Sequence, residues 1–220
     1  MDETRLTVNG EALVLDAAGA LYWPGERMLV FADLHFEKGS SYARRGALLP
    51  PYDTRTTLAR IVALQTRYEP ACVIALGDSF HDREAHERLD DYERDTLSRL
   101  GDGADWIWIA GNHDPAPPSW LNGRVAEEVA IGGLIFRHEP SAAPAAGEIA
   151  GHLHPCASVT RRGRTLRRRC FVSDGLRLLL PAFGAYAGGL DVRDAAVRSL
   201  FGDEFLTYVL GARRVYAIAA

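Results

Sequence analysis

Short apolar runs alternate with amphipathic segments in the first half of the chain. Three apolar runs, over residues 28–31, 72–76 and 106–110, predict strands, because continuous runs of this length are typical of strands buried on both faces. The segments between them, over residues 53–68 and 83–100, carry apolar residues at helical spacing and predict helices. The order strand, helix, strand, helix, strand indicates a sheet of the α/β class.

Antiparallel hairpins are predicted on either side of this region. Within residues 5–23, two short apolar runs flank Asn9-Gly10, which is a strong two-residue hairpin signal. Residues 159–172 also read as a hairpin, with Gly163 at its turn and arginines projecting on both sides. The second half of the chain is therefore expected to be richer in strands than the first.

No repeat or low-complexity linker divides the sequence, so residues 1–220 are predicted to form one domain. One more helix is expected over residues 191–202, before two apolar runs at the end of the chain.

Composition limits the classes of protein to be considered. Hydrophobic residues make up 47% of the chain and charged residues 25%, as in ordinary globular proteins. No apolar run approaches the roughly 20 residues of a membrane helix, and the N-terminus carries acidic residues where a secretory signal has basic ones. A cytoplasmic location is therefore expected. The net charge of −4 means that any affinity for phosphate groups must be local.

Polar clusters follow the predicted strands, and five of the seven histidines lie in them. In chain order the clusters are Asp33-x-His35, Gly77-Asp78, Gly111-Asn112-His113-Asp114, His138 and Gly151-His152-x-His154. Sites in α/β folds form at the carboxyl ends of the strands, so these clusters are expected to meet at one edge of a sheet.

Side chains of these types suit two adjacent divalent cations. A carboxylate can bridge two cations, and mixed nitrogen and oxygen ligands favour Mn, Fe, Zn or Co over Mg or Ca. In an extended chain, Asp-x-His and His-x-His place both side chains on one face. Taken alone, Asp78 could equally be a helix cap. The five clusters in this order predict a dinuclear metal centre.

The same series of motifs resembles that of the calcineurin-like metallophosphoesterases, over about residues 28–156. The resemblance implies a four-layer αββα sandwich, with two packed mixed sheets flanked by helices. It implies that Asp78 bridges two metal ions. The implied ligands of the first ion are Asp33, His35 and His154, and those of the second are Asn112, His138 and His152.

A narrower resemblance extends from about Met28 to Val192. The segments ADLHFEKGSSYARRGALLPPYDTRTTLARI, LGDSFHD and LPAFGAYAGGLDV are similar to the DNA ligase-associated metallophosphoesterases, the PdeM group. This resemblance implies a manganese-dependent phosphodiesterase that acts as a single-strand DNA endonuclease. It also implies a functional association with a DNA ligase, an exonuclease and a helicase in DNA repair.

One stretch departs from the superfamily pattern. Many phosphatases of this fold read GDxxDR, and the arginine holds a phosphate. Here Gly77-Asp78 is followed by Ser79 and Phe80, and then by His81-Asp82, so an aspartate stands in place of the arginine. A phosphodiester carries one negative charge, and loss of the arginine affects it less than a dianionic monoester. The sequence therefore favours a diester substrate.

The resemblance also suggests roles in catalysis. His113 directly follows a ligand, and is predicted to stabilise the transferring phosphoryl group or to protonate the leaving oxygen. Asp114 is predicted to orient that imidazole and to favour its charged form; a turn residue before Pro115 is the alternative. His81 is predicted either to contact the phosphate or to support a ligand.

Basic residues follow the first and the last metal motif. Lys38 and Arg44 come after the first, and Arg161 and Arg164 belong to the run TRRGRTLRRRC after the last. All four are predicted to contact substrate phosphates, although ordinary solvated charges would look the same. Three aromatic residues could stack on bases, although core packing is the default expectation for Trp23, Phe36 and Tyr186.

Two other functions stay open at this point. A hydrolase of nucleotides or small pyrophosphates with the same fold often carries a cap domain, and no long insertion is present. A non-catalytic scaffold of the same fold would be expected to lose the histidine that stands here as His113.

Overall fold

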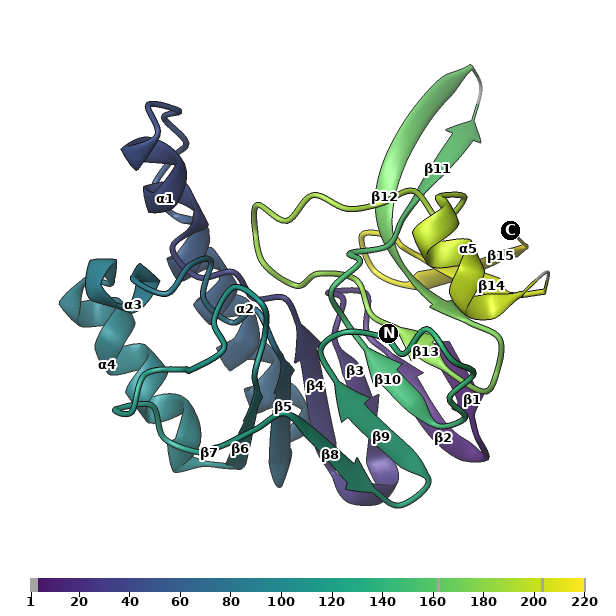
Figure 1. Ribbon diagram of the computed structural model, residues 1–220, viewed down its shortest axis with the longest axis horizontal. Helices are drawn as coiled ribbons and strands as arrows, with labels where there is room; N and C mark the ends of the chain where they lie inside the picture. The colour runs from purple at the N-terminus through teal and green to yellow at the C-terminus, as the bar shows by residue number, and fades with distance from the viewer. Residues whose placement is uncertain (1–3, 162, 203, 220) are drawn as a thin grey trace.

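The computed structural model describes residues 4–161, 163–202 and 204–219. Within those residues, the strands form one sheet of seven and one of eight. The two sheets pack face to face, with α2 and α4 on the outside of the first and α5 on the outside of the second (Figure 1). The α/β sandwich of two mixed sheets between helices, predicted from the sequence, is confirmed.

The first sheet supplies three of the strand ends that carry polar clusters. Its order is β1 (Thr4–Val8), β2 (Glu11–Leu15), β3 (Leu21–Trp23), β4 (Met28–Ala32), β5 (Cys72–Leu76), β6 (Asp105–Ile109) and β7 (Arg124–Ala126). The pairs from β1 to β4 are antiparallel, and those from β4 to β7 are parallel. Asn9 and Gly10, with φ of 48° and 87°, form the predicted tight turn between β1 and β2.

The second sheet supplies the other two strand ends. Its order is β15 (Val215–Ala219), β14 (Leu206–Leu210), β12 (Arg164–Ser173), β13 (Leu178–Leu179), β10 (Glu148–Ala150), β9 (Leu134–Arg137) and β8 (Glu128–Ile131), with β11 (Cys156–Arg161) paired to β12. Strands β9, β10 and β13 run parallel to one another. Their direction brings the ends of β9 and β10 to the same side of the sandwich as those of β4, β5 and β6.

Strands β4, β5 and β6 of the first sheet are buried on both faces. In β4, Met28, Val30 and Ala32 pack into the core between the two sheets. Leu29 and Phe31 point the other way, into the core beneath the helices. Both faces need apolar residues, which explains why these strands read as continuous apolar runs.

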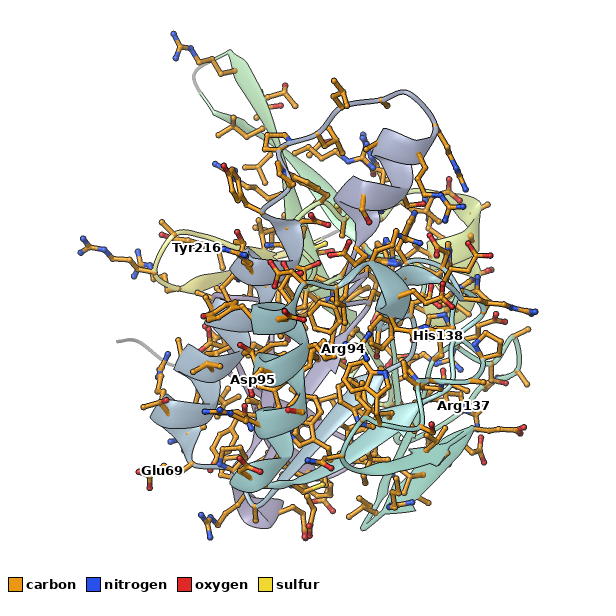
Figure 2. All side chains as sticks on the ribbon, turned by 90° about the vertical axis from the view of Figure 1, so that its left-hand side faces the viewer. Glu69, Arg94, Asp95, Arg137, His138 and Tyr216 are labelled. Carbon is orange, nitrogen blue, oxygen red and sulfur yellow. The ribbon has the colours of Figure 1, made fainter. Side chains whose placement is uncertain are left out.

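The helical layer over the first sheet contains α2 (Asp53–Tyr68) and α4 (Asp91–Arg99), and Figure 2 looks onto it. The remaining short helices are α1 (Lys38–Arg44), α3 (Ala85–Arg88), α5 (Ala195–Phe201) and the 3-10 turns η1 (Pro24–Glu26) and η2 (Leu100–Asp102). At 16 residues, α2 is the longest of the described helices, and none of them has the length and apolarity to cross a bilayer.

Two predicted helices have different bounds in the structure. The single helix expected over residues 83–100 is divided into α3 and α4. The Asp90 side chain accepts the Glu93 N–H at 2.8 Å, and the Glu93 side chain accepts the Asp90 N–H at 3.1 Å, so a capping box starts a new helix there. The helix expected over residues 191–202 begins only after Asp194, which caps α5.

Candidate active site

The polar clusters follow directly on strands β4, β5, β6, β9 and β10. Five of their side chains stand on left-handed backbone: Asp33, His35, Asp78, His152 and His154 have φ of 52°, 47°, 47°, 69° and 47°. Such backbone is unfavourable for residues other than glycine and persists where the surrounding structure enforces it, most often at functional sites. The strain therefore marks these strand ends as a candidate site.

The first group of converging side chains consists of Asp33, His35 and His154. The Nε2 atoms of the two imidazoles lie 3.2 Å apart, and Asp33 Oδ1 lies 3.3 Å from His154 Nε2. Asp33 is fully buried. A buried carboxylate between two imidazole nitrogens is a suitable set of ligands for one divalent cation.

The second group is formed by Asp78, His138 and His152, with Asn112 beside them. His138 Nδ1 donates to the Leu76 carbonyl at 2.9 Å, which leaves Nε2 of the neutral ring as an acceptor. That Nε2 lies 2.9 Å from Asn112 Oδ1, 3.2 Å from His152 Nδ1 and 3.4 Å from Asp78 Oδ1.

Acceptor atoms that converge in this way repel one another unless a cation lies among them. A backbone carbonyl that holds the distal nitrogen of a histidine is also the usual support of a metal ligand. Both groups therefore fit divalent metal ions, and together they contain all seven predicted ligands. The bridging role of Asp78 stays a prediction.

Glycines next to the ligands leave no space for a side chain. A Cβ atom on Gly77 would lie 2.5 Å from the His138 ring, and one on Gly151 would lie 2.7 Å from Asp33 Oδ2. A Cβ atom on Gly111 would lie 2.2 Å from the Asp78 backbone nitrogen. These glycines let ligands from different strands approach closely.

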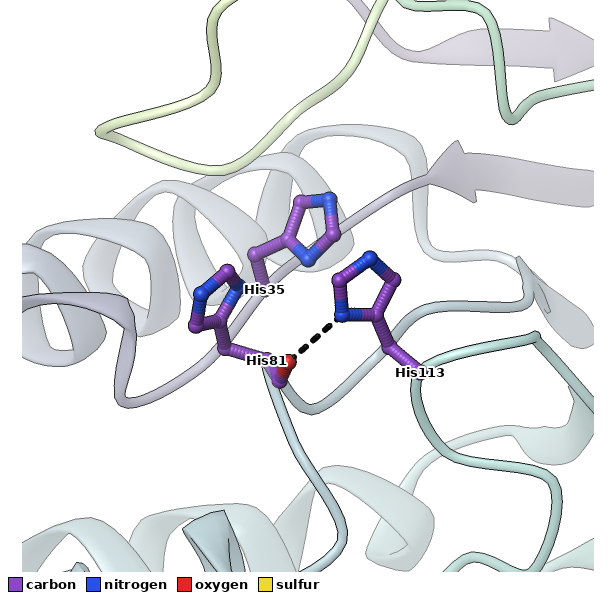
Figure 3. A group of neighbouring side chains, drawn as sticks. All are labelled: His35, His81 and His113. Atoms are coloured by element: carbon purple, nitrogen blue, oxygen red, sulfur yellow. Dashed lines mark hydrogen bonds between the residues drawn. The ribbon is translucent and has the colours of Figure 1, made fainter. Parts of the chain in front are cut away.

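Three imidazoles, those of His35, His81 and His113, surround a common space beside the first group (Figure 3). Their ring centroids lie 5.2–5.4 Å apart. Burial, together with the nearby positive charges of Lys38 and Arg45, lowers the pKa of His81 to about 4. Burial also holds the pKa of His35 far below its usual value. Both rings are therefore neutral at neutral pH.

The orientation of His113 has a different origin from the one we expected. Its Nδ1 donates to the His81 carbonyl at 2.7 Å, whereas Asp114 Oδ2 accepts the backbone N–H of Phe80 at 2.9 Å. Burial raises the pKa of the Asp114 carboxyl to about 8. Asp114 therefore stabilises the loop that carries Asp78. The orientation of the His113 ring is fixed by its hydrogen bond to the His81 carbonyl.

The His113 side chain remains 40% exposed, and its Nδ1 is occupied by the hydrogen bond to His81. Nε2 is the ring atom left to act on a substrate. It lies 3.8 Å from Asp78 Oδ2, so a group bound against the second set of ligands would meet this nitrogen.

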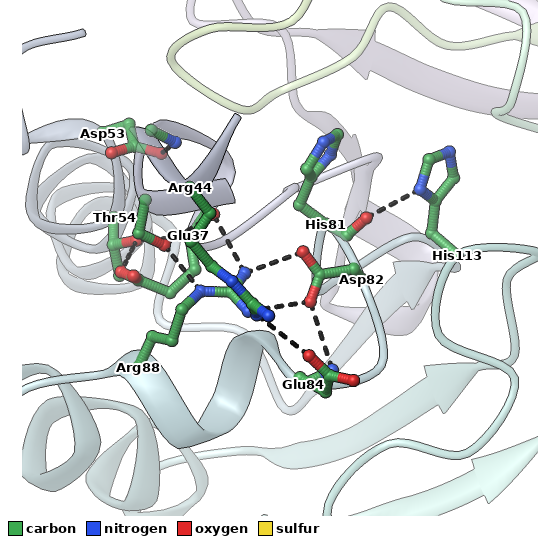
Figure 4. A network of polar contacts seen from close by, with 11 residues as sticks. Glu37, Arg44, Asp53, Thr54, His81, Asp82, Glu84, Arg88 and His113 are labelled. Carbon is green, nitrogen blue, oxygen red and sulfur yellow. Dashed lines mark hydrogen bonds and ion pairs between the residues drawn. The ribbon is translucent and has the colours of Figure 1, made fainter. Parts of the chain in front are cut away.

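The polar contacts beside the histidines are drawn in Figure 4. Asp82 forms a two-pronged ion pair with Arg88, at 2.8 Å and 2.9 Å. Arg88 also donates to Ser40 of α1, at 2.8 Å. Its guanidinium therefore links α1 to the loop that contains Asp82. Arg88 therefore does not replace the phosphate-binding arginine of the superfamily pattern.

The predicted substrate-binding residues differ in their surroundings. Lys38 is half-buried; burial lowers its pKa, and the carboxylates of Asp33, Asp53 and Asp78 act against this, so Lys38 lies near both ligand groups. Arg44 is exposed and pairs with Glu84 at 2.9 Å. Arg164 is exposed, without an ion pair to any described residue. The side chain of Arg161 lies outside the described residues.

The hairpin of β11 and β12 extends from Cys156 to Ser173 and presents two different faces. Arg167 donates to the Gly189 carbonyl. Arg169 donates to the carbonyls of Ala182, Phe183 and Gly184, at 2.8, 3.2 and 3.2 Å. These carbonyls belong to the loop over residues 180–190, which also hydrogen-bonds the backbone of Asp33. Two arginines of the basic run therefore have a structural role.

Replacing Arg169 with methionine should lower the free energy of unfolding by about 1.5–3 kcal/mol, because three carbonyls lose a charged donor. Urea denaturation of the metal-free protein measures this change. Arg168→Met is the matched control: Arg168 is an exposed neighbour on the other face of the strand, and its replacement should change stability by less than about 0.5 kcal/mol. Equal effects of the two substitutions would contradict the assignment.

Of the aromatic residues considered for base stacking, Trp23 and Phe36 are buried in the core. The Tyr186 hydroxyl donates to the Pro50 carbonyl at 2.7 Å. An exposed aromatic residue beside the histidines is Tyr42, with its ring centroid 6.1 Å from that of His81. Tyr42 is not among the residues predicted from the sequence, although it lies four residues after Lys38 on the same helix.

Comparison with known proteins gives three findings. The sequence pattern of the calcineurin-like phosphoesterases matches residues 26–170. The crystal structure of the nuclease MPE of Pseudomonas putida is similar to this chain, with 32% sequence identity and a TM-score of 0.78, over 98% of this chain and 100% of that one. Yfce, a phosphoesterase from E. coli, is 11% identical, with a TM-score of 0.41, over 87% of this chain and 98% of that one. No curated protein sequence matches significantly.

Proposed function

The chain belongs to the calcineurin-like phosphoesterase family, and from this premise we propose that it is a metal-dependent phosphodiesterase that cuts single-stranded DNA internally. The observation that carries the proposal is the convergence of two ligand groups and three imidazoles at one edge of the sandwich. The similar Pseudomonas putida protein is a nuclease, which supports a nucleic-acid substrate. We further propose that the enzyme works in the cytoplasm in DNA repair, alongside a DNA ligase, an exonuclease and a helicase.

The proposed cofactor is a pair of Mn²⁺ ions. Asp33, His35 and His154 would hold one ion, Asn112, His138 and His152 the other, and Asp78 would contact both. Bound divalent metal would supply a water of lowered pKa and would neutralise charge on the phosphoryl oxygens. The lowered pKa values of His35 and His152 suit this task, because a proton on a coordinating nitrogen would compete with the metal.

The chain's own contribution to the reaction is proposed to centre on His113. Its ring is fixed at Nδ1 by the His81 carbonyl, so Nε2 can contact the phosphoryl group or deliver a proton to the leaving oxygen. His81 is proposed to line the phosphate site with its ring, and Lys38 to place a positive charge nearby. Asp114 acts as a positioning residue, through its hydrogen bond to the Phe80 N–H.

A diester is the favoured substrate because the expected phosphate-gripping arginine is missing. Asp82 stands in that place, and its ion pair with Arg88 removes this guanidinium from the substrate side. A monoanionic diester tolerates this arrangement better than a dianionic monoester. On the basic hairpin, Arg161 and Arg164 are proposed to contact the nucleic-acid backbone; Arg44, which is paired with Glu84, contributes less than a free cation would.

The purified protein should hydrolyse bis-p-nitrophenyl phosphate and nick circular single-stranded DNA in the presence of Mn²⁺. Both activities should be lost with EDTA and return when Mn²⁺ is restored, because the proposed chemistry requires bound metal. Initial rates on these substrates, on p-nitrophenyl phosphate and on a nucleoside diphosphate measure the preference. Hydrolysis of the monoester or the diphosphate without nicking of DNA would overturn the proposal in favour of a small-molecule hydrolase.

A further inference from the structure

Helix α1 begins three residues after the proposed ligand His35 and carries Lys38 and Tyr42 four positions apart, on one side of the helix. Arg45, which caps the C-terminus of α1, follows three positions after Tyr42. Figures 1 and 2 both show α1 projecting from the end of the sandwich where the strand-end loops lie. The row leads away from the candidate site.

Each member of this row, which we call the α1 stripe, is close to the candidate site. The Lys38 ammonium is close enough to the carboxylates of Asp33 and Asp78 for their negative charges to oppose the lowering of its pKa by burial. The Tyr42 ring lies 6.1 Å from the His81 ring, at an interplanar angle of 32°. Arg45 is near enough for its charge to act on His81 as well. A cation, an aromatic ring and a second cation therefore follow one another outward from the histidines.

The Tyr42 ring is not part of the core. Tyr42 is 39% exposed, although a large aromatic residue is usually buried. Its ring is tilted against the neighbouring ring of His81, and the residue stays partly open to solvent. An exposed ring held by a neighbour offers a flat apolar surface at little further cost in conformational entropy.

Arg45 lies beside a hollow of about 460 Å³, lined also by Ser41, Arg44, Asp82, Arg83 and Glu84. Two of the arginines near this hollow are neutralised, since Arg44 pairs with Glu84 and Arg88 pairs with Asp82. Among the residues that the structure describes, no ion pair engages Arg45 or Arg83. The hollow therefore retains positive charge that is complementary to a phosphate.

The geometry points to the α1 stripe as the binding site of the nucleotide next to the scissile phosphate, with its base stacked on Tyr42 and its outer phosphate against Arg45. This inference rests on the proposed function and names the part of the substrate that is recognised. Only an unpaired base has a free π-face for such stacking. The stripe would thus make the enzyme selective for single strands without reading their sequence.

The test compares cleavage of a single-stranded DNA oligonucleotide with cleavage of a strand of the same length made of abasic residues. The abasic strand keeps the phosphates and lacks the bases. The wild-type enzyme should prefer the DNA strand, measured as the ratio of the two kcat/KM values. Tyr42→Ala should lower that ratio by about 5- to 100-fold, by lowering kcat/KM on DNA alone, whereas Tyr42→Phe should retain it.

Tyr92→Ala is the matched control. Tyr92 is a 62% exposed tyrosine on α4, with the Arg55 guanidinium over its ring, and its replacement should leave the ratio unchanged. Arg45→Gln should weaken the dependence of KM on salt, lowering the slope of log KM against log salt concentration by about 0.7. An unchanged ratio in Tyr42→Ala, or equal losses on both strands, would overturn the inference. Failure of the wild-type enzyme to cut either strand would instead reject the proposed function.

Discussion

Alanine at position 113 should lower kcat on a diester by about 10²–10⁴-fold, the usual contribution of a general acid. The reason is geometric: the His81 carbonyl holds Nδ1 of the His113 ring, and Nε2 is the atom that remains to act on the substrate. His113 belongs to neither of the two proposed ligand groups, so His113→Ala should bind as much Mn²⁺ as the wild type. Steady-state kinetics and metal analysis of the same samples measure both quantities.

His86→Ala is the control for this experiment. His86 lies on α3, outside all three groups of converging side chains, and its loss should leave kcat and bound metal unchanged. If His113→Ala kept its full activity, the assigned role would be wrong. If it lost activity and metal together, His113 would have to be counted among the ligands.

Gly111→Ala should remove activity by displacing Asp78 and so opening the second ligand group. The added Cβ atom would lie 2.2 Å from the Asp78 backbone nitrogen and 2.3 Å from its Oδ1. Neither atom can yield at low cost, since Asp78 Oδ1 also accepts the His113 N–H at 2.9 Å. We expect the affinity for Mn²⁺ to fall by about 10- to 100-fold, as when the support of a ligand is lost.

The control for this substitution is Gly103→Ala, because a Cβ atom on Gly103 would meet nothing within 4 Å. Isothermal titration with Mn²⁺ compares the two variants. Wild-type affinity in Gly111→Ala would show that the strand ends can separate without loss of the ion, and would contradict the close packing of the ligands described here.

The sequence was most informative where local pattern and burial agree. Strands β4, β5 and β6 were predicted because both of their faces are covered by apolar layers, as for Val30 on one side and Phe31 on the other. Four of the proposed ligands, Asp33, His35, Asp78 and Asn112, could be predicted because they follow such strands. The division of the helix at Asp90 was not predicted, although Asp90 and Glu93 have the spacing of a capping box.

Other features depend on contacts between distant parts of the chain. Asp114 contacts the N–H of Phe80, 34 positions earlier, and no local pattern indicates this partner. In the basic run, alternation along the strand separates Arg168 from its neighbours Arg167 and Arg169. The register of β11 against β12 and the position of the loop over residues 180–190 determine which of these arginines hydrogen-bond to that loop. Neither can be read from the local sequence.

The most direct test of the account is anomalous X-ray diffraction from crystals grown with Mn²⁺, recorded at the manganese absorption edge. We expect two peaks in each molecule, one in contact with His35 and His154 and the other in contact with His138 and His152. A single peak, or peaks that touch neither pair of histidines, would contradict a dinuclear centre at these strand ends.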